Sequence, residues 1–259
     1  MATAKGKGET EGTALVEQPP TPTALATYDP RDRRGREELT EDDAEMPRLA
    51  ICQGTSPQKN EDDGKYIPDL KEGDLFNSLT QQVYGRGPVN VAVVAIKRRA
   101  MQFGRDAAGK QTKEVIDRDV PWDDPRCQWT DGPNNTRNKP IATQIYDYYV
   151  WLPATHEPAV ISMSVTKMKI ARAINGLLRY RSGPTWLSMF QVGVAREKDG
   201  DHNYFNFKVR AGDPTPLSAL KACEEFFAQL QVATPKIHED GGVTDDAPVR
   251  VVDADPVPF

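Results

Sequence analysis

The pattern of hydrophobic positions in the middle of the chain predicts a fold built mainly from β-strands. Residues 88–96 are almost continuously apolar and β-branched, and Gly87 and Pro88 bound them, which is typical of a buried strand. An Asp-Gly pair at residues 199–200 lies between two alternating segments and predicts a hairpin. The remaining expected strands are residues 48–53, 75–80, 141–152, 159–165, 186–195 and 203–210.

Two segments show the three- and four-residue spacing of an amphipathic helix instead. The first, residues 166–181, has one apolar stripe with cations beside it, namely Lys169, Arg172 and Arg179. The second, residues 214–232, is expected to close the folded part. Residues 104–140 form a polar insert that contains Trp122 and Trp129. An insert of this length inside a compact domain is more often functional or mobile than a simple connection.

Both ends of the chain lack apolar periodicity. Residues 1–45 are rich in Pro, Thr, Ala, Gly and Glu, and residues 233–259 are acidic. Such segments bury too little apolar surface to offset the entropy of folding, so both are expected to be disordered. The folded domain is therefore expected to span residues 46–232.

Charge is distributed unevenly along the chain, whose formal net charge is -5. The two end segments, residues 1–45 and 233–259, carry an excess of acidic residues, whereas residues 86–210 hold 20 basic and 12 acidic residues. A basic centre between acidic arms favours an anionic partner for the folded domain.

The expected strand at residues 141–152 is crowded with aromatic side chains. Strict alternation places Tyr146 and Tyr148 on one face, and Asp147, Tyr149 and Trp151 on the other. The face that contains Asp147 is expected to be exposed, which nominates Tyr149 and Trp151 as available rings.

Rings interleaved with cations suit a flexible single strand of nucleic acid, because bases stack on rings while cations follow the phosphates. The alternative interpretation is that most of these rings simply form the core. The candidate nucleic-acid-binding residues are Lys97, Arg98, Arg99, Phe103, Tyr149, Trp151, Lys167, Lys169, Arg172, Tyr204, Lys208 and Arg210.

Other classes of site have little support. Neither the three cysteines nor the three histidines have the spacing of a metal site, and no phosphate-binding glycine loop or nucleophile elbow is present. Asp123, Asp124 and Asp147 would be the residues of a nuclease metal cluster, but acidic loop residues are usually solvated. We therefore expect no enzyme activity, no cofactor and no metal. The apolar runs are too short for a membrane span and no apolar signal region precedes them, so a cytoplasmic location is expected.

The last seven residues, Asp-Ala-Asp-Pro-Val-Pro-Phe, resemble the C-terminal tip of bacterial and phage single-stranded DNA-binding proteins, an acidic stretch that ends in Pro-Phe or Asp-Phe. The resemblance implies that the tip recruits replication, recombination and repair proteins and competes weakly with DNA. The implied partner-binding residues are Asp253, Asp255, Pro256, Pro258 and Phe259.

A second resemblance covers most of the middle of the chain. Residues 47–53, 73–77 and 97–99 and the helix after Met163 are similar to a group of tailed-phage proteins with an OB-type barrel. The implied fold is α+β, mainly β: a barrel of about five strands with a long inserted helix and a C-terminal helix. The insert and the long helix depart from the bacterial protein, so a monomer or small homo-oligomer is expected.

These observations together favour a protein that coats and protects single-stranded DNA in phage replication or recombination. A single-strand annealing or recombination-mediator protein remains an alternative, as does an RNA-binding or transcription-accessory protein on the same fold. The side chains do not separate DNA from RNA, because both polymers present the faces of their bases.

Overall fold

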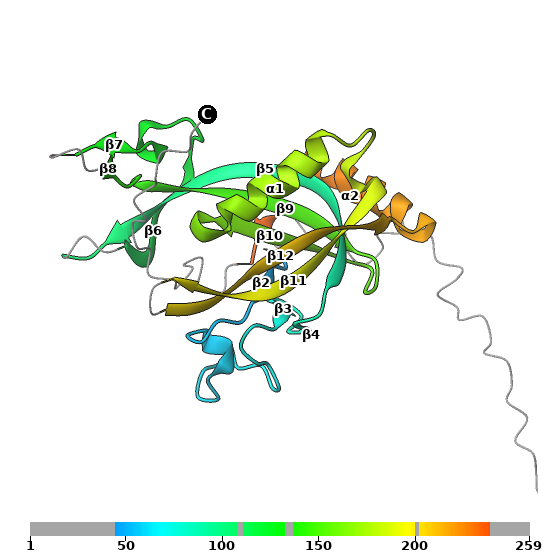
Figure 1. Ribbon diagram of the computed structural model, residues 1–259, viewed down its shortest axis with the longest axis horizontal. Helices are drawn as coiled ribbons and strands as arrows, with labels where there is room; N and C mark the ends of the chain where they lie inside the picture. The colour runs from blue at the N-terminus through cyan, green and yellow to red at the C-terminus, as the bar shows by residue number, and fades with distance from the viewer. Residues whose placement is uncertain (1–44, 108–110, 133–136, 200–201, 239–259) are drawn as a thin grey trace, which may run out of the picture. The chain divides into compact units, whose positions relative to one another are not determined.

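The computed structural model describes residues 45–107, 111–132, 137–199 and 202–238, which all belong to one compact unit, Thr40–Phe259 (Figure 1). The expected mainly β, α+β class is confirmed. The helices are α1 (Met168–Arg179) and α2 (Leu217–Val232), with short 3-10 turns η3 (Pro57–Lys59), η4 (Pro125–Cys127), η6 (Val165–Lys167) and η7 (Thr185–Leu187). The strands are β1 (Glu45–Met46), β2 (Leu49–Ile51), β3 (Leu75–Asn77), β4 (Val83–Gly85), β5 (Val89–Arg105), β6 (Gln111–Val120), β7 (Thr130–Asp131), β8 (Arg137–Asn138), β9 (Ala142–Leu152), β10 (Glu157–Ser164), β11 (Ser188–Asp199), β12 (His202–Pro214) and β13 (Lys236–Ile237).

The central sheet is antiparallel and has the order β10-β9-β5-β11-β12, with β6 paired to the far half of β5. Among the strands of this path, which leaves out β6, the fourth in chain order, β11, returns to lie beside the first, β5. This spatial order of 4-1-2-3 is that of a Greek key. The helix α1 lies in the connection between β10 and β11.

A second sheet, β2-β3-β4, contacts both ends of this path. The amide of Val160 on β10 donates to the carbonyl of Pro47 at 2.8 Å. At the other end, the side-chain amide of Gln53 exchanges two hydrogen bonds, of 2.7 and 3.0 Å, with the backbone of Phe205 on β12. Within the described residues β10 and β12 do not pair directly, so the barrel expected from the sequence is not closed by its own strands.

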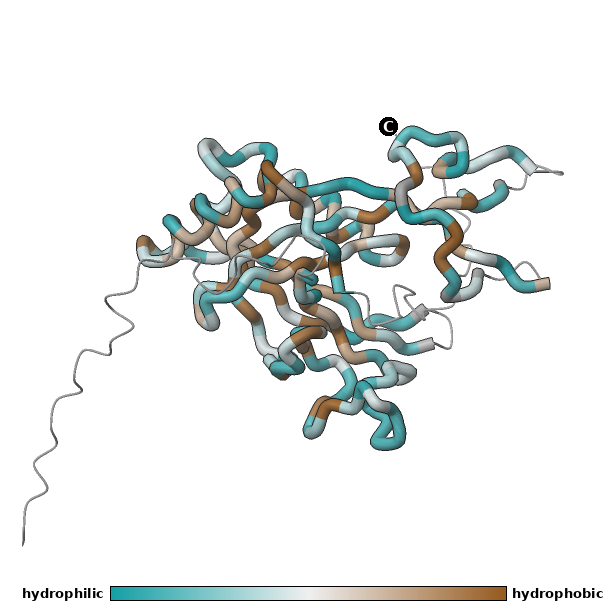
Figure 2. Tube along the Cα trace, turned by 180° about the vertical axis from the view of Figure 1, so that it is seen from behind, coloured by the Kyte–Doolittle hydropathy of each residue, from teal (hydrophilic) through white to brown (hydrophobic). Residues whose placement is uncertain are grey.

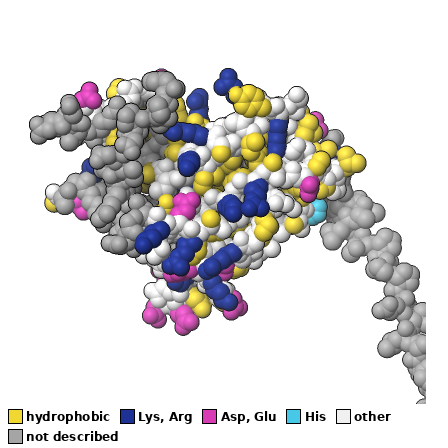
Figure 3. Space-filling model, viewed as in Figure 1, with side chains coloured by type: hydrophobic (Ala, Val, Ile, Leu, Met, Phe, Trp, Pro, Cys, Tyr) yellow, Lys and Arg dark blue, Asp and Glu magenta, His cyan; other side chains and the backbone are white. Residues whose placement is uncertain are grey.

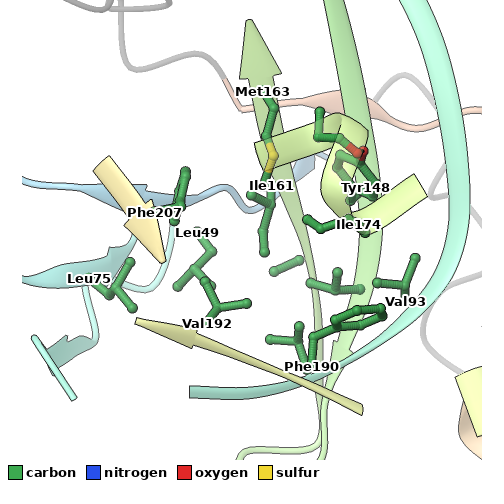
Figure 4. Packing of buried hydrophobic residues seen from close by; sticks show 14 of the residues in the cluster. Leu49, Leu75, Val93, Tyr148, Ile161, Met163, Ile174, Phe190, Val192 and Phe207 are labelled. Atoms are coloured by element: carbon green, nitrogen blue, oxygen red, sulfur yellow. The ribbon is translucent and has the colours of Figure 1, made fainter. Parts of the chain in front are cut away.

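One hydrophobic core lies between the central sheet and α1. Figure 4 shows Ile174 of α1 beside the Tyr148 ring, with Phe190 and Val93 of the sheet next to each other in the same cluster. The Tyr148 hydroxyl donates toward the Ala171 carbonyl at 3.0 Å and lies 2.9 Å from the amide oxygen of Asn175, so it ties the sheet to the helix. The apolar stripe from which this helix is predicted is therefore the face of α1 that packs against the sheet.

A second core lies on the opposite face of the same sheet, under α2. Helix residues at spacings of four, three and four are buried there: Ala219, Cys223, Phe226 and Leu230. They pack against Ala92, Val94 and Tyr149 of the sheet. Hydrophobic positions accordingly concentrate along the central strands, and hydrophilic ones at the outer loops (Figure 2). Because a helix covers each face, both rows of side chains are buried in the middle of β9, from Asp147 to Val150.

No helix among the described residues is long and apolar enough to cross a membrane.

Candidate nucleic-acid interface

The predicted exposure of Tyr149 is wrong, and the candidate binding residue Phe103 is buried as well. Tyr149 is 1% exposed beneath α2, and burial raises its pKa to about 12. Trp151 is half-buried on the same face, with its ring centroid 6.3 Å from that of Phe226. Phe103 is buried in a small cluster with Met101 and other side chains. The physical reason for the burial of Tyr149 is that α2 forms a second layer over the face that contains Asp147.

Arg99 does not line a surface for phosphate, contrary to the prediction. Its Nε donates to the Asp147 carboxylate at 2.5 Å, and that carboxylate is also the acceptor for the Ser162 hydroxyl at 2.5 Å. Asp147 is 1% exposed, so its charge needs the guanidinium as a partner. Arg99 is therefore part of an internal ion pair.

Lys97 has an internal role as well. Its Nζ donates to the Leu230 carbonyl at 3.2 Å and to the Thr234 hydroxyl, and lies 5.8 Å from the centre of the Tyr149 ring. Burial lowers the pKa of Lys97. The last carbonyls of a helix lack intrahelical partners and carry partial negative charge, so this ammonium stabilises the C-terminal end of α2.

The candidate residues on β12 lie in two environments: Lys208 and Arg210 are exposed, whereas Tyr204 is half-buried beside a carboxylate. Phe205, Phe207 and Val209 face the α1 core, so alternation directs Lys208 and Arg210 to the opposite, exposed face. Tyr204 is half-buried, and its hydroxyl donates to the Glu197 carboxylate at 2.8 Å. The same carboxylate accepts a hydrogen bond from the Asn206 side chain at 3.1 Å. An anionic neighbour makes Tyr204 a poor place for phosphate.

The sequence around α1 contains Lys and Arg residues but no acidic residue close to them. Residues 158–196 contain no Asp or Glu. Lys169 and Arg172 are exposed beside the apolar stripe, and Lys167 lies over the Phe207 ring at 5.4 Å from its centre. Arg179 is also exposed but is absent from the sequence-based candidates. Figure 3 shows Lys and Arg side chains spread over the face that carries α1, with fewer acidic side chains between them.

Two further rings on the α1 side, those of Trp122 and Tyr146, are absent from the candidate binding residues. The Trp122 and Tyr146 ring centroids lie 5.1 Å apart at an interplanar angle of 65°. The Arg98 guanidinium lies 5.2 Å from the centre of the Trp122 ring, and Tyr146 stacks on Tyr148 at 6.3 Å. Trp122 and Tyr146 are half-buried, and Arg98 is exposed. Alternation excluded Tyr146 by assigning its face to the core, and no local pattern pairs Trp122 with a strand.

The arrangement of acidic side chains offers no metal site in the part of the chain that the structure describes: no group of three or more His, Cys, Asp and Glu side chains is placed to hold an ion. Asp124 accepts hydrogen bonds from Arg126, which lowers the pKa of that carboxyl. Asp147 is paired with Arg99. The carboxylates considered for a nuclease are thus each occupied by a separate arginine, apart from Asp123.

Comparison with known protein families assigns this chain to one of them. The sequence model of the Pam3 phage gp34-like protein family matches residues 10–236. The chain belongs to that family. It is therefore a phage protein, which confirms the expected bacteriophage origin. No curated protein and no solved structure matches it.

The match to the gp34-like family ends at residue 236, so it leaves out all but the first four residues of the acidic tail. The predicted partner-binding residues Asp253, Asp255, Pro256, Pro258 and Phe259 lie outside the described residues of this gp34-like protein. Their expected role rests on the sequence resemblance and is independent of the family match.

Proposed function

We propose that this gp34-like protein binds and coats single-stranded DNA, without enzymatic activity, during phage replication or recombination in the cytoplasm of the host cell. The observation that carries the proposal is the run from residue 158 to residue 196, which has no acidic residue and exposes Lys169 and Arg172 on α1. Phosphates along a flexible strand need such cations without competing carboxylates. Membership of a phage family supports the setting.

The strand order supports an OB-type fold. An OB-fold is a partly open, five-stranded Greek-key barrel, and the path β10-β9-β5-β11-β12 contains a Greek key of antiparallel strands. In this proposal the bridge through Pro47 and Gln53 takes the place of direct pairing between the two ends of the path. OB-folds commonly bind oligonucleotides, which agrees with the proposed ligand.

The phosphate-binding surface that we propose differs from the one expected from the sequence. Lys97 and Arg99 are excluded because they bind α2 and Asp147. The remaining exposed candidates are Arg98, Lys169, Arg172, Lys208 and Arg210. Binding should weaken steeply with salt, with a log–log slope of roughly 0.7 per phosphate contacted on a single strand.

The test is a titration of labelled oligo(dT) by fluorescence anisotropy at several salt concentrations. A Lys169→Gln/Arg172→Gln variant is expected to bind more weakly, with a slope shallower by about 1.4 if each cation contacts one phosphate. Lys221→Gln is the matched control, because Lys221 is an exposed lysine on α2 that pairs with Glu225 at 3.8 Å. Absence of oligonucleotide binding by the unmodified protein in dilute buffer would refute the proposal. A matched oligo(U) competitor distinguishes a DNA binder from an RNA binder.

The tail contributes a separate part of the proposal, which is that its last residues recruit other replication or recombination proteins. Removing residues 253–259 is expected to leave oligo(dT) affinity unchanged or higher, because these seven residues add only negative charge to a protein that binds an anion. A lower affinity for oligo(dT) after this truncation would contradict the proposed role of the tail.

A further inference from the structure

Three elements bring Arg98, Trp122 and Tyr146 together on the α1 side of the sheet. Arg98 on β5 lies opposite Tyr146 on β9 in the strand ladder, and Trp122 lies in the turn after β6. We call Trp122 and Tyr146 the ring pair. Their tilted arrangement and 5.1 Å separation are those of a favourable edge contact between aromatic rings.

Arg98 differs from its neighbour Arg99 in what surrounds its charge. Arg99 is neutralised by the buried carboxylate of Asp147. Among the described residues, no carboxylate is paired with Arg98, whose guanidinium is exposed and lies over the Trp122 ring. A guanidinium that rests on an indole keeps its N–H donors available, and these donors fit the oxygens of a phosphate.

The loop that carries Trp122 is held by several contacts that do not involve the indole. The Gln144 side-chain amide donates to the Trp122 backbone carbonyl at 3.2 Å, which fixes the start of the loop. Asp124 caps η4 by accepting from the Arg126 amide at 2.8 Å. Cys127 is buried in a cluster with Ala100, Val120 and Ala142. These contacts hold the loop at points other than the indole, and the indole is only half-buried beside an exposed arginine, so part of the ring is available to a ligand.

We infer that Arg98 and the ring pair form a subsite for one nucleotide of an unpaired strand. The base stacks on the exposed part of the ring pair, and the guanidinium binds the adjoining phosphate. Stacking on a ring does not depend on base identity, so the subsite accepts any base. The inference rests on the proposed function and adds to it the position at which a base is held.

The subsite and α1 lie on the same face of the sheet. Tyr146 stacks on Tyr148, whose hydroxyl contacts the α1 residues Ala171 and Asn175. Tyr146 is also the ladder partner of Met163, just before η6 and the first cations of α1. A strand bound by the ring pair therefore needs no turn around the sheet to reach Lys169 and Arg172.

The experiment compares two ligands of equal length: oligo(dT) and an abasic deoxyribose-phosphate chain, which has the phosphates but no bases. Trp122→Leu is expected to reduce oligo(dT) affinity about 5- to 150-fold while leaving the abasic affinity and the salt slope unchanged. Trp122→Phe retains a ring and should keep most of the affinity. Trp129→Leu is the matched control, because Trp129 is 54% exposed and no ring contact is recorded for it within the described residues.

A complementary variant tests the phosphate half of the subsite. Arg98→Gln is expected to lower affinity for both ligands and to make the salt slope shallower by about 0.7. An unchanged slope would overturn the role of Arg98.

The outcomes separate the inference from the proposed function. If the unmodified protein binds neither oligo(dT) nor oligo(U), the proposed function fails. If it binds oligo(U) alone, the assignment to DNA fails. The subsite is then tested with oligo(U): a loss of affinity in Trp122→Leu supports it, and an unchanged affinity refutes it. If it binds oligo(dT) and Trp122→Leu binds equally well, the subsite is refuted and the function stands. Equal losses for oligo(dT) and the abasic chain would show that the indole is structural, which also refutes the subsite.

Discussion

The ion pair between Arg99 and Asp147 gives the sharpest prediction on stability. Asp147 lies on β9 with a side chain that is 2% exposed, whereas the Arg99 side chain on β5 is 24% exposed. The Asp147 carboxylate accepts two hydrogen bonds of 2.5 Å, one from Arg99 and one from the Ser162 hydroxyl. Asp147→Ala is expected to destabilise the protein, because it leaves a guanidinium and a hydroxyl without this acceptor.

The magnitude follows from the burial of the two partners. Removing one partner of a fully buried pair costs about 3–5 kcal/mol. Arg99 is about a quarter exposed and so can recover some hydration, which lowers the expected cost for Asp147→Ala to about 2–3 kcal/mol. For a folded unit of this size, that corresponds to a fall in Tm of roughly 4–12 °C. Arg99→Met should cost more than Asp147→Ala, because it leaves the more deeply buried charge uncompensated.

The assay is urea and thermal unfolding of both single variants and of the Arg99→Met/Asp147→Ala double variant. The double variant is expected to lose less stability than the sum of the single losses, because the second change removes a charge that the first left alone. Additive losses would refute the coupling. The salt slope for oligo(dT) should be the same for Arg99→Met as for the unmodified protein. A shallower slope would show that Arg99 contacts phosphate after all.

Three further predictions concern the closure of the sheet and the buried thiols. Gln53→Ala should cost about 1–3 kcal/mol and speed hydrogen exchange of the Phe205 amide, because it removes both hydrogen bonds to β12. Gly73→Ala should cost about 2–4 kcal/mol in urea unfolding, because φ is 82° and the added Cβ would lie 2.7 Å from Phe205 Cε1. Burial raises the pKa of both Cys52 and Cys223 from 9.0 to about 11, so urea unfolding should show stability falling as pH rises from 9 to 11.

The glycine and thiol predictions each have a control. Gly85 has a φ of 70° but nothing within 4 Å of an added Cβ, so Gly85→Ala should cost only the strain of the backbone, about 1–2 kcal/mol. The sign of the pH effect follows from the unfolded chain, whose thiols lose their protons first, so alkaline pH favours unfolding. Replacing Cys52 and Cys223 with Ala should flatten this pH dependence, and an unchanged slope would refute the assignment to the thiols.

The sequence predicted the elements whose hydrophobic pattern is set locally. The strand expected at residues 88–96 is the first half of β5, and the helix expected at residues 166–181 contains α1. The sequence did not predict that β5 continues to Arg105, or that β6 lies in the polar insert. Those parts form an extension where charged side chains such as Arg98 remain exposed, so hydrophobic alternation is weak there.

The candidate site was predicted less well, for a reason visible along β9. Alternation correctly separates Tyr148 from Tyr149, since one packs under α1 and the other under α2. It cannot show whether a second layer covers a given face. That layer, α2, comes from residues more than 60 positions later in the chain. The ring pair depends likewise on a contact between Trp122 and a strand that follows it across the insert.

The position of α2 decides where an unpaired strand can bind. If the five strands of the path form an OB-type barrel, the customary binding face is that of its second and third strands, β9 and β10. Here the outer side of those strands carries α2 over Tyr149 and Val160. Stacking two bases on Tyr149 and Trp151 would contribute about 2–6 kcal/mol.

Exposing the rings of Tyr149 and Trp151 requires α2 to detach from the sheet. Exposure of Phe226 and Leu230 alone would cost roughly 3–6 kcal/mol, since each is almost fully buried. The loss of Cys223 burial and of the Lys97 contact to the end of α2 adds to that cost. The cost of detaching α2 would thus offset most or all of the free energy gained by stacking on Tyr149 and Trp151. The ring pair and the α1 cations are already partly exposed, so a strand that binds on the α1 side gains its contacts without unfolding a helix.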